Sequence, residues 1–325
     1  MTAPITLAAF AVVVATLGRW LLARSAWPDR SPRLGILAWQ ALSLSILVSV
    51  VLAGLALAVP EIPFSTNVAA LLSACTVALR SQYATPGGAA LSVTGGMLAV
   101  TVMARVGYCL VAGLVTSRRQ RRRQLEALTL AHRGHEGSCD ALVVDHPAAA
   151  AYCLPGRREQ IVVTTAAVAA LDHDQLAAVL AHERAHLRGR HDLMLAASDT
   201  LRRAFPRVQA FSDAHHATVR LVEMLADDVA ARRNDRLTIA TALVRLAEAS
   251  APAPAASLGA GGSTSLARVR RLVAPAHPLS VTGSAIAVLV AAALLATPVA
   301  VVAAPAVLAT AADLCPISFS GQMPS

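Results

Sequence analysis

The chain has 325 residues, of which 56% are hydrophobic and 14% are charged, and its mean hydropathy is +0.58. This composition excludes an ordinary soluble globular protein of this size and indicates an integral membrane protein. The net charge of +9 does not indicate nucleic-acid binding, because the densest basic run lies beside an apolar segment and no nucleic-acid-binding motif accompanies it. Attraction to the anionic headgroups of membrane lipid explains the charge better, and we expect no direct contact with nucleic acid.

Four apolar segments are long enough to cross a hydrocarbon core, which requires about 20 residues. They are residues 4–22, 34–58, 89–116 and 279–304. The first has no basic region before its apolar run, so we interpret it as a retained anchor and not as a cleaved signal peptide. A shorter apolar run, Val68–Leu79, is expected to form an interfacial or re-entrant helix.

The distribution of arginine predicts the orientation of these segments in the cell membrane (the inner or plasma membrane). Arginines at positions 24, 30 and 33 follow the first segment, and a run at 118, 119, 121, 122 and 123 follows the third. The connection from Val59 to Gly88 contains a single basic residue, Arg80. The positive-inside rule therefore predicts that residues 117–278 form a cytoplasmic domain and that residues 305–325 form a short extracytoplasmic tail.

The expected cytoplasmic domain combines a small β-sheet with several helices. Two β-like pieces, Ala141–Val144 and Gln160–Thr165, precede a helix that Asp172 and Gln175 begin as a capping-box pair and that ends at Gly189. Further helices are predicted at about 193–205, 214–233 and 237–249, and residues 250–265, rich in proline, alanine, glycine and serine, are expected to be a flexible loop. The fold class is thus a mainly α integral membrane protein with an α+β domain.

The pattern H-E-x-x-H occurs at His182, Glu183 and His186 within this predicted helix. Two histidines four residues apart can offer both imidazoles to one metal ion, and the glutamate between them can act as a general base. A chance cluster on a polar helix is the alternative explanation of so short a pattern. The rest of the chain must therefore supply a third ligand.

Two residues compete for that third position. Asp192 lies six residues after His186 and follows Gly189, as in the pattern H-E-x-x-H-x-x-G-x-x-[HD]. Glu223 begins the string E-x-x-A-D, in which Asp227 lies one helical turn further on and can accept a hydrogen bond from a ligating imidazole. The second arrangement supplies both a third ligand, Glu223, and a carboxylate, Asp227, that can orient a ligating histidine.

These motifs together resemble the gluzincin-type membrane metalloproteases, and most closely the BlaR/MecR antirepressor family. The shared features are VVTT, D-x-x-Q-L-x-A-V-L-A-H-E-x-x-H, E-x-x-A-D and RVRRL before the last apolar segment. The resemblance implies one Zn²⁺ held by His182, His186 and Glu223, a general base at Glu183, and a ligand oriented by Asp227. It also implies that Tyr152 and Cys153 belong to a strand at the edge of the substrate cleft, while His191 and Asp192 become a polar helix exit.

The same resemblance implies regulated proteolysis, with a winged-helix repressor of the BlaI/MecI type as the expected protein substrate. The chain departs from the beta-lactam sensors of that family, because only about 20 residues follow the last apolar segment. We therefore do not expect a penicillin-binding sensor domain. The alternatives are an HtpX-like or CAAX-type membrane protease for quality control or processing, and a zinc-stabilised signalling scaffold without catalysis. The sequence does not indicate an oligomeric state.

Overall fold

The computed structural model describes residues 2–59, 80, 86–131, 141–156, 159–250, 258–275 and 277–313. The predicted interfacial segment Val68–Leu79 and most of the predicted extracytoplasmic tail lie outside the described residues. The chain forms two compact units. The first unit comprises Met1–Leu21, Ala41–Arg105 and Leu289–Ser325, and the second comprises Leu22–Gln40 and Val106–Val288.

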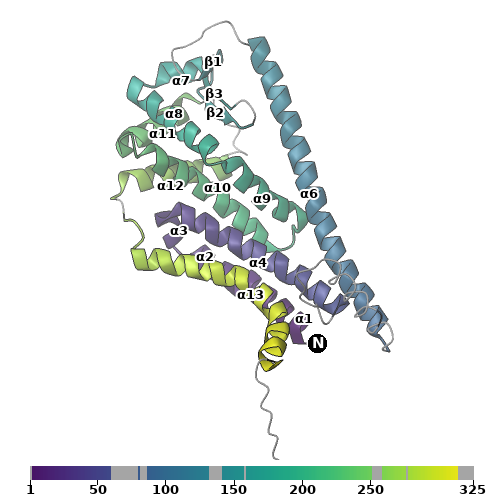
Figure 1. The fold of residues 1–325 in the computed structure, drawn as a ribbon. Helices are drawn as coiled ribbons and strands as arrows, with labels where there is room; N and C mark the ends of the chain where they lie inside the picture. Colours follow the sequence, from purple (N-terminus) through teal and green to yellow (C-terminus); the bar gives the residue numbers. More distant parts are fainter. Residues whose placement is uncertain are drawn as a thin grey trace, which may run out of the picture. The chain divides into compact units, whose positions relative to one another are not determined.

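Long apolar helices make up the first unit and continue into the second (Figure 1). They are α1 (Thr2–Val13), the π-helical turn η1 (Val14–Gly18), α2 (Arg19–Arg24), α4 (Pro32–Ala58), α6 (Gly88–Ala131) and α13 (Val281–Asp313). Four helical stretches of the described chain are long and apolar enough to cross a membrane: Thr2–Arg24, Pro32–Ala58, Gly88–Arg123 and Val281–Ala304. The prediction of four apolar helices of spanning length is thus confirmed, whereas the side of the membrane stays a prediction.

Helix α6 is longer than the segment expected to span. It continues through the basic run SRRQRRRQ to Ala131. No glycine or proline follows Gly113 in this helix, and arginine, glutamine, leucine and alanine all favour helix. The third apolar segment is therefore extended by a polar helical arm.

Within the first unit, small residues allow close approach of helix backbones. A Cβ atom added at Gly54 would lie 2.8 Å from the carbonyl oxygen of Gly95, so α4 and α6 touch at these glycines. The hydroxyl of Ser45 on α4 donates to the carbonyl of Leu294 on α13 at 2.7 Å. Close backbone contact and interhelical hydrogen bonds are the usual means of packing helices in a membrane, where apolar burial gives little driving force.

The second unit contains a three-stranded sheet and seven helices of the described chain besides the ends of the apolar ones. The strands are β1 (Leu142–Val144), β2 (Ala151–Leu154) and β3 (Gln160–Thr164). Their order is β1-β3-β2, with β1 parallel and β2 antiparallel to β3. The helices are α3 (Trp27–Arg30), α7 (Thr165–Ala170), α8 (His173–Arg188), α9 (His191–Ala204), α10 (Gln209–Ala230), α11 (Arg236–Ala249) and α12 (Leu258–Val273).

These elements agree with most of the helices and strands expected from the sequence. Both β-like pieces are strands, and β2 lies at an edge of the described sheet, as the resemblance implied for Tyr152 and Cys153. One segment differs. Helix α12 begins at Leu258, inside the stretch expected to be a flexible loop, because it is continuous with the amphipathic run that ends at Val273.

The sheet fixes the position of α8. Ile161 and Val163 of β3 pack with Leu180 and Leu187 of α8 in one buried cluster. β-branched residues suit the pleated surface, and the apolar positions of α8 recur at helical spacing, so each element buries one face against the other. His182 and His186 lie on another face of α8, which packs against α10.

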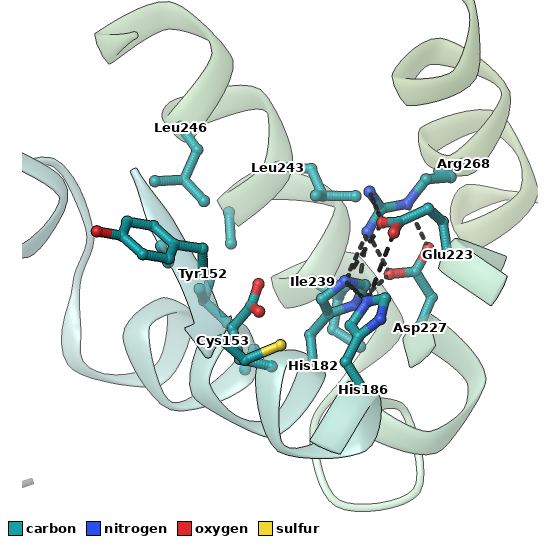
Figure 2. A pocket seen from close by; sticks show the side chains of 15 residues that line it. Tyr152, Cys153, His182, His186, Glu223, Asp227, Ile239, Leu243, Leu246 and Arg268 are labelled. Carbon is teal, nitrogen blue, oxygen red and sulfur yellow. Dashed lines mark hydrogen bonds and ion pairs between the residues drawn. The ribbon is translucent and has the colours of Figure 1, made fainter. Parts of the chain in front are cut away.

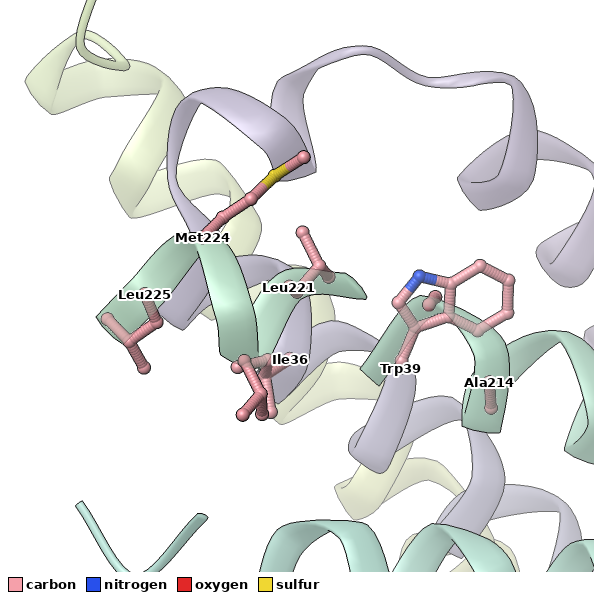
Figure 3. Close-up of a cluster of buried hydrophobic side chains, with 8 residues drawn as sticks. Ile36, Trp39, Ala214, Leu221, Met224 and Leu225 are labelled. Carbon is pink, nitrogen blue, oxygen red and sulfur yellow. The ribbon is translucent and has the colours of Figure 1, made fainter. Parts of the chain in front are cut away.

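A second buried cluster joins the first turns of α4 to α10. Ile36 and Trp39 of α4 pack with Leu221 and Met224 of α10 (Figure 3). A Cβ atom at Gly35 would lie 2.8 Å from Cβ of Pro28 in α3 and 2.9 Å from a methyl group of Leu221, so glycine lets the start of α4 lie close to both α3 and α10. The beginning of an apolar helix of spanning length is thus packed directly against α10.

Candidate metal centre

Helix α8 begins and ends where the sequence predicted. The carboxylate of Asp172 accepts a hydrogen bond from the backbone N–H of Gln175 at 2.8 Å, and the Gln175 side chain accepts from the Asp172 N–H at 3.3 Å. This capping box satisfies donors that a helix N-terminus otherwise leaves unpaired, and Gly189 caps the other end. His182 and His186 therefore lie one turn apart on the same face of α8.

Helix α10 places two carboxylates beside these histidines. It packs against both α8 and α9 and carries Glu223 and Asp227 one turn apart. An oxygen of Asp227, which is 1% exposed, lies 2.9 Å from Nδ1 of His182. This contact fixes the ring of His182 with Nε2 directed away from Asp227. Burial alone lowers the pKa of His182, but the hydrogen bonds to Asp227 and Glu223 raise it to about 9.

Three potential ligand atoms converge on one point between α8 and α10 (Figure 2). Nε2 of His182 lies 3.0 Å from Nε2 of His186, and the two carboxylate oxygens of Glu223 lie 3.5 Å from these nitrogens. Mutual separations within 4.8 Å place all three donors in reach of a single ion. Two imidazoles and one carboxylate, with room for a further ligand, form the donor set of catalytic zinc sites.

The protonation of the second histidine suits a metal ligand. Burial, followed by the charge of His182, lowers the pKa of His186 to about 4, so its ring is neutral at pH 7 and offers a lone pair. His182 must lose its proton when a metal binds, as ligating imidazoles do. The residues present therefore fit zinc in number, chemical type and mutual distance.

Arg268 of α12 donates hydrogen bonds to the carboxylates of both Asp227 and Glu223. Its Nε and Nη2 atoms donate to the two oxygens of Asp227 at 2.8 and 2.7 Å, and its Nη1 atom donates to Glu223 at 2.9 Å. The guanidinium is buried, and such paired, charge-assisted bonds are strong and directional. Although burial raises the pKa of Asp227, bonds from Arg268 and His182 lower it to about 2. The sequence resemblance included Arg268 but not this contact.

Glu183 lines the same cavity from α8, next to Cys153 of the edge strand β2. Burial is the main cause that raises the pKa of Glu183, and a raised pKa suits a carboxylate that must take up and release a proton. Burial, followed by the negative charge of Glu183, raises the pKa of the Cys153 thiol to about 12, so the thiol stays protonated. Cys153 thus lines the cavity as a neutral side chain.

The cavity has a volume of about 410 Å³ and two chemically different parts. The polar part contains the histidines, carboxylates and Arg268 described above. The apolar part lies between α8, α11 and β2, and Figure 2 shows Ile239, Leu243 and Leu246 of α11 in its wall with Tyr152 of β2. The arrangement is a candidate metal centre that opens into an apolar cleft beside a strand edge.

His191, one of the two residues predicted to form a polar helix exit after α8, is buried. His191 is 2% exposed, and its Nδ1 atom lies 3.2 Å from Nδ1 of His186. Arg190 adopts a left-handed conformation with φ 49°, which turns the chain sharply and returns His191 toward α8. The prediction of a polar helix exit therefore misses that His191 is buried beside His186. A histidine five residues beyond a ligand, after a glycine, is a sequence signal for such a return.

Asp192 was the alternative third ligand. Among the residues that the structure describes, the group able to hold a metal contains Glu223 and does not contain Asp192. One oxygen of Asp192 is buried without a hydrogen-bond partner in that part of the chain. The geometry thus brings Glu223, and not Asp192, to the two histidines of α8.

Comparison with known proteins gives one match. Residues 115–298, more than half of the chain, match the family model described as peptidase family M48. The matched range includes both helices of the metal centre. No curated protein and no solved structure matches this chain.

Proposed function

This chain belongs to peptidase family M48, a family of zinc metallopeptidases, and we propose that it is a membrane-embedded zinc endopeptidase of the H-E-x-x-H gluzincin type. The convergence of His182, His186 and Glu223 on one point, with Glu183 in the same cavity, is the observation that carries this proposal. In this proposal His182, His186 and Glu223 bind the metal, and Asp227 orients His182.

When bound, zinc supplies Lewis-acid polarisation of the scissile carbonyl and acidifies a water molecule. The Glu183 carboxylate would accept a proton from the attacking water and later deliver it to the leaving amine. A raised pKa suits a group that takes up and releases a proton. Asp227 accepts the Nδ1 hydrogen bond of His182 and thereby keeps Nε2 as the ligand atom. Arg268 keeps both carboxylates in place and offsets their mutual repulsion.

The substrate lies along the edge strand β2. An extended peptide can pair with the outer edge of this strand in the described sheet, and the apolar wall formed by Ile239, Leu243 and Leu246 then receives a hydrophobic side chain. Main-chain pairing positions the scissile bond, while the apolar wall selects the side chain. We therefore propose an endopeptidase that cleaves extended segments beside an apolar residue.

The catalytic residues face the cytoplasm in this proposal, because arginines follow the first and third apolar segments. The role is regulated proteolysis, and a winged-helix repressor of the BlaI/MecI type is the substrate that the sequence resemblance suggests. Quality control or processing of membrane proteins, as in HtpX-like or CAAX-type proteases, is the second role for the same site.

One comparison in cells tests catalysis and substrate together. New N-terminal peptides are measured in cells that carry the wild-type chain or Glu183→Gln, which retains the size of the side chain but not its basicity. Peptides that depend on Glu183 identify the substrate, and a repressor or a membrane protein among them decides between the two roles. Asp174→Asn is the matched control, because Asp174 lies exposed in the first turn of the same helix.

A zinc-stabilised scaffold is the alternative from another class. It predicts that the purified wild-type chain and Glu183→Gln bind zinc equally and that neither generates a new N-terminus in any candidate substrate. Cleavage by the wild type alone, at equal zinc content, supports the peptidase. Equal peptide patterns in both strains would instead support the scaffold.

A further inference from the structure

A second cavity, of about 670 Å³, lies in the same unit as the metal centre. Helices α10 and α12 line both cavities, but different residues of each helix face the two cavities. Met224 and Asp228 line it where Glu223 and Asp227 line the first cavity, and Arg271 lines it where Arg268 lines the first. The short helix α3 and the segment before α13 complete its wall.

The position of this cavity along the chain places it at a membrane boundary. Asp29 and Arg30 lie between Arg24, where the first candidate span ends, and Pro32, where the second begins. Pro278 lies three residues before Val281, where the last span begins. Because these span ends all border the cavity in sequence, its wall lies where the chain passes between the apolar and polar phases, which is the level of lipid headgroups.

The charges in the cavity favour an anion. Arg30 donates from Nε and Nη2 to the carbonyls of His277 and Pro278 at 3.0 and 3.2 Å, and Arg236 donates in the same way to those of Leu272 and Arg271 at 3.1 and 2.6 Å. Within the part of the chain that the structure describes, neither guanidinium is paired with a carboxylate, and each keeps its Nη1 group for another acceptor.

Both carboxylates that line the cavity have their own partners. Asp228 receives two hydrogen bonds from Arg271, at 2.6 and 2.8 Å, and Asp29 is paired with Arg220. Two positive charges therefore remain without compensation, on Arg30 and Arg236. An anion with one or two charges would neutralise them, and the planar guanidinium suits the oxygens of a phosphate group.

Most of the remaining wall is apolar, apart from His277. Met224, Ala267, Ala274 and Pro275 contribute hydrocarbon surface next to the two arginines. An inorganic anion would leave this surface in contact with water, whereas an amphiphile would cover it with its glycerol and acyl carbons. The combination of phosphate-binding groups, apolar wall and membrane boundary matches one class of ligand.

We propose that this cavity, lined by Arg30, Arg236 and the apolar residues of α10 and α12, binds the phosphate headgroup of an anionic phospholipid. The two guanidiniums contact the phosphate oxygens, and the apolar wall contacts the glycerol and the first acyl carbons. Anionic lipid is thereby bound as a structural ligand at a defined site, beyond the general attraction of basic residues to a membrane surface.

Native mass spectrometry of the full chain in detergent micelles tests this assignment. Phosphatidylglycerol and phosphatidylcholine with identical acyl chains are titrated separately. We expect one phosphatidylglycerol to bind with about tenfold higher affinity, because each basic residue near the headgroup contributes a severalfold preference. The double variant Arg30→Gln/Arg236→Gln should lose this preference. Equal binding of the two lipids by the wild type would overturn the proposal.

Two further variants separate lipid binding from loss of fold. Arg245→Gln removes the same charge from an exposed position of α11 outside the cavity and should retain the wild-type preference. Ala274→Phe leaves every arginine in place and fills the cavity from its exposed wall, so steric overlap should weaken binding of phosphatidylglycerol about tenfold. Unchanged lipid binding by Ala274→Phe, or a loss equal to that of the double variant in Arg245→Gln, would contradict the site.

A soluble phosphate is distinguished from a lipid by competition. Millimolar inorganic phosphate or glycerol 1-phosphate is added to the complex with phosphatidylglycerol. We expect the lipid to remain bound, because the apolar wall contributes to its affinity and not to theirs. Complete displacement by either soluble phosphate would show that the cavity recognises a free phosphate, and the lipid assignment would fall.

Discussion

Helices α10 and α12 each face two cavities of opposite charge. The metal centre is lined by Glu223, Asp227 and Arg268. The second cavity, here called the arginine-lined cavity because Arg30 and Arg236 line it, is also lined by Asp228 and Arg271. Successive residues of a helix are rotated by about 100°, so the pair Asp227 and Asp228 is divided between the two cavities. Identical residue types one position apart thus acquire unrelated roles.

The difference between the cavities arises from the partners that other elements supply. Helix α8 brings two histidines and Glu183 to the first cavity, where the histidines and Glu223 converge on a point that a cation can occupy. Helix α3 and the start of α11 bring Arg30 and Arg236 to the second, where both carboxylates are already paired. Removal of one partner should therefore affect one cavity and leave the other unchanged.

Removal of zinc is expected to have the largest effect. Saturating zinc at about a thousand times its dissociation constant should stabilise the folded chain by about 4 kcal/mol, because the metal binds only the assembled site. A strong chelator should lower the unfolding temperature by several degrees and abolish peptide hydrolysis. The measurement is thermal unfolding of the full chain in detergent, with and without zinc.

The same experiment on Glu223→Ala provides the control. The chelator should change the unfolding temperature of this variant much less than that of the wild type, because its site lacks one ligand. A zinc-dependent shift as large as that of the wild type would contradict the metal centre.

Replacement of a carboxylate on α10 should next separate the two cavities. Glu223→Ala should reduce zinc affinity by more than the tenfold to hundredfold loss typical of residues that only support a ligand. Asp228→Ala, five residues further along α10, should keep wild-type affinity because Asp228 pairs with Arg271 in the other cavity. Competition with a chromophoric chelator measures both affinities.

Asp192→Ala extends this test to the alternative third ligand. Because Asp192 lies outside the group formed by His182, His186 and Glu223, its replacement should leave zinc affinity unchanged. A large loss in Asp192→Ala together with retained affinity in Glu223→Ala would reverse the assignment.

The arginines of α12 should differ in the same way, with a smaller effect. Arg268→Gln should lower zinc affinity by about tenfold to hundredfold, because Asp227 and Glu223 lose the group that orients them. In the cobalt-substituted protein, the visible absorption bands should shift, since they report the geometry of the ligands and not the stability of the fold. Arg271→Gln should leave both properties unchanged.

Local patterns explain why much of the metal centre could be predicted from the sequence. The capping box, the i, i+4 histidines and the E-x-x-A-D string each depend on residues within a few positions of one another, so helix geometry alone determines how their side chains are related. A further constraint was needed to predict that the H-E-x-x-H and E-x-x-A-D strings contribute to the same site. The donor number of zinc supplied it and left Asp192 and Glu223 as candidates.

Contacts between distant segments could not be predicted in this way. Arg268 follows Asp227 by 41 residues, and only the packing of α12 on α10 brings them together. The RVRRL string offers three arginines without indicating which one faces the metal. The arginine-lined cavity joins α3 to a segment more than 240 residues later, so no local pattern indicates it.

The turn at Arg190 shows a third limit. His191 belongs to the metal-site surroundings because a single residue adopts a left-handed conformation, which only a few per cent of non-glycine residues do. Helix periodicity continued through Gly189 would place His191 on a different face of α8. The correct position depends on the tertiary contact with His186, which the sequence does not encode locally.

The smallest expected effect concerns the ion pair between Asp228 and Arg271. Both side chains are partly exposed, at 30% and 19%, so water screens the interaction. Arg271→Gln should therefore destabilise the chain by about 1 kcal/mol, the upper end for such pairs, and lower the unfolding temperature by a few degrees. A third hydrogen bond, from Nε of Arg271 to the carbonyl of Asp29, also joins α12 to α3 and adds to this loss.

Thermal unfolding of Arg271→Gln, compared with Arg268→Gln at equal zinc, completes the contrast between the cavities. In Arg271→Gln the zinc-dependent shift in unfolding temperature should equal that of the wild type, because no atom of Arg271 contacts a ligand. In Arg268→Gln the shift should shrink, because weaker binding contributes less stabilisation at the same zinc concentration. Equal shifts in the two variants would mean that both arginines act only by joining α12 to α10, and the division of α12 between two cavities would have no functional consequence.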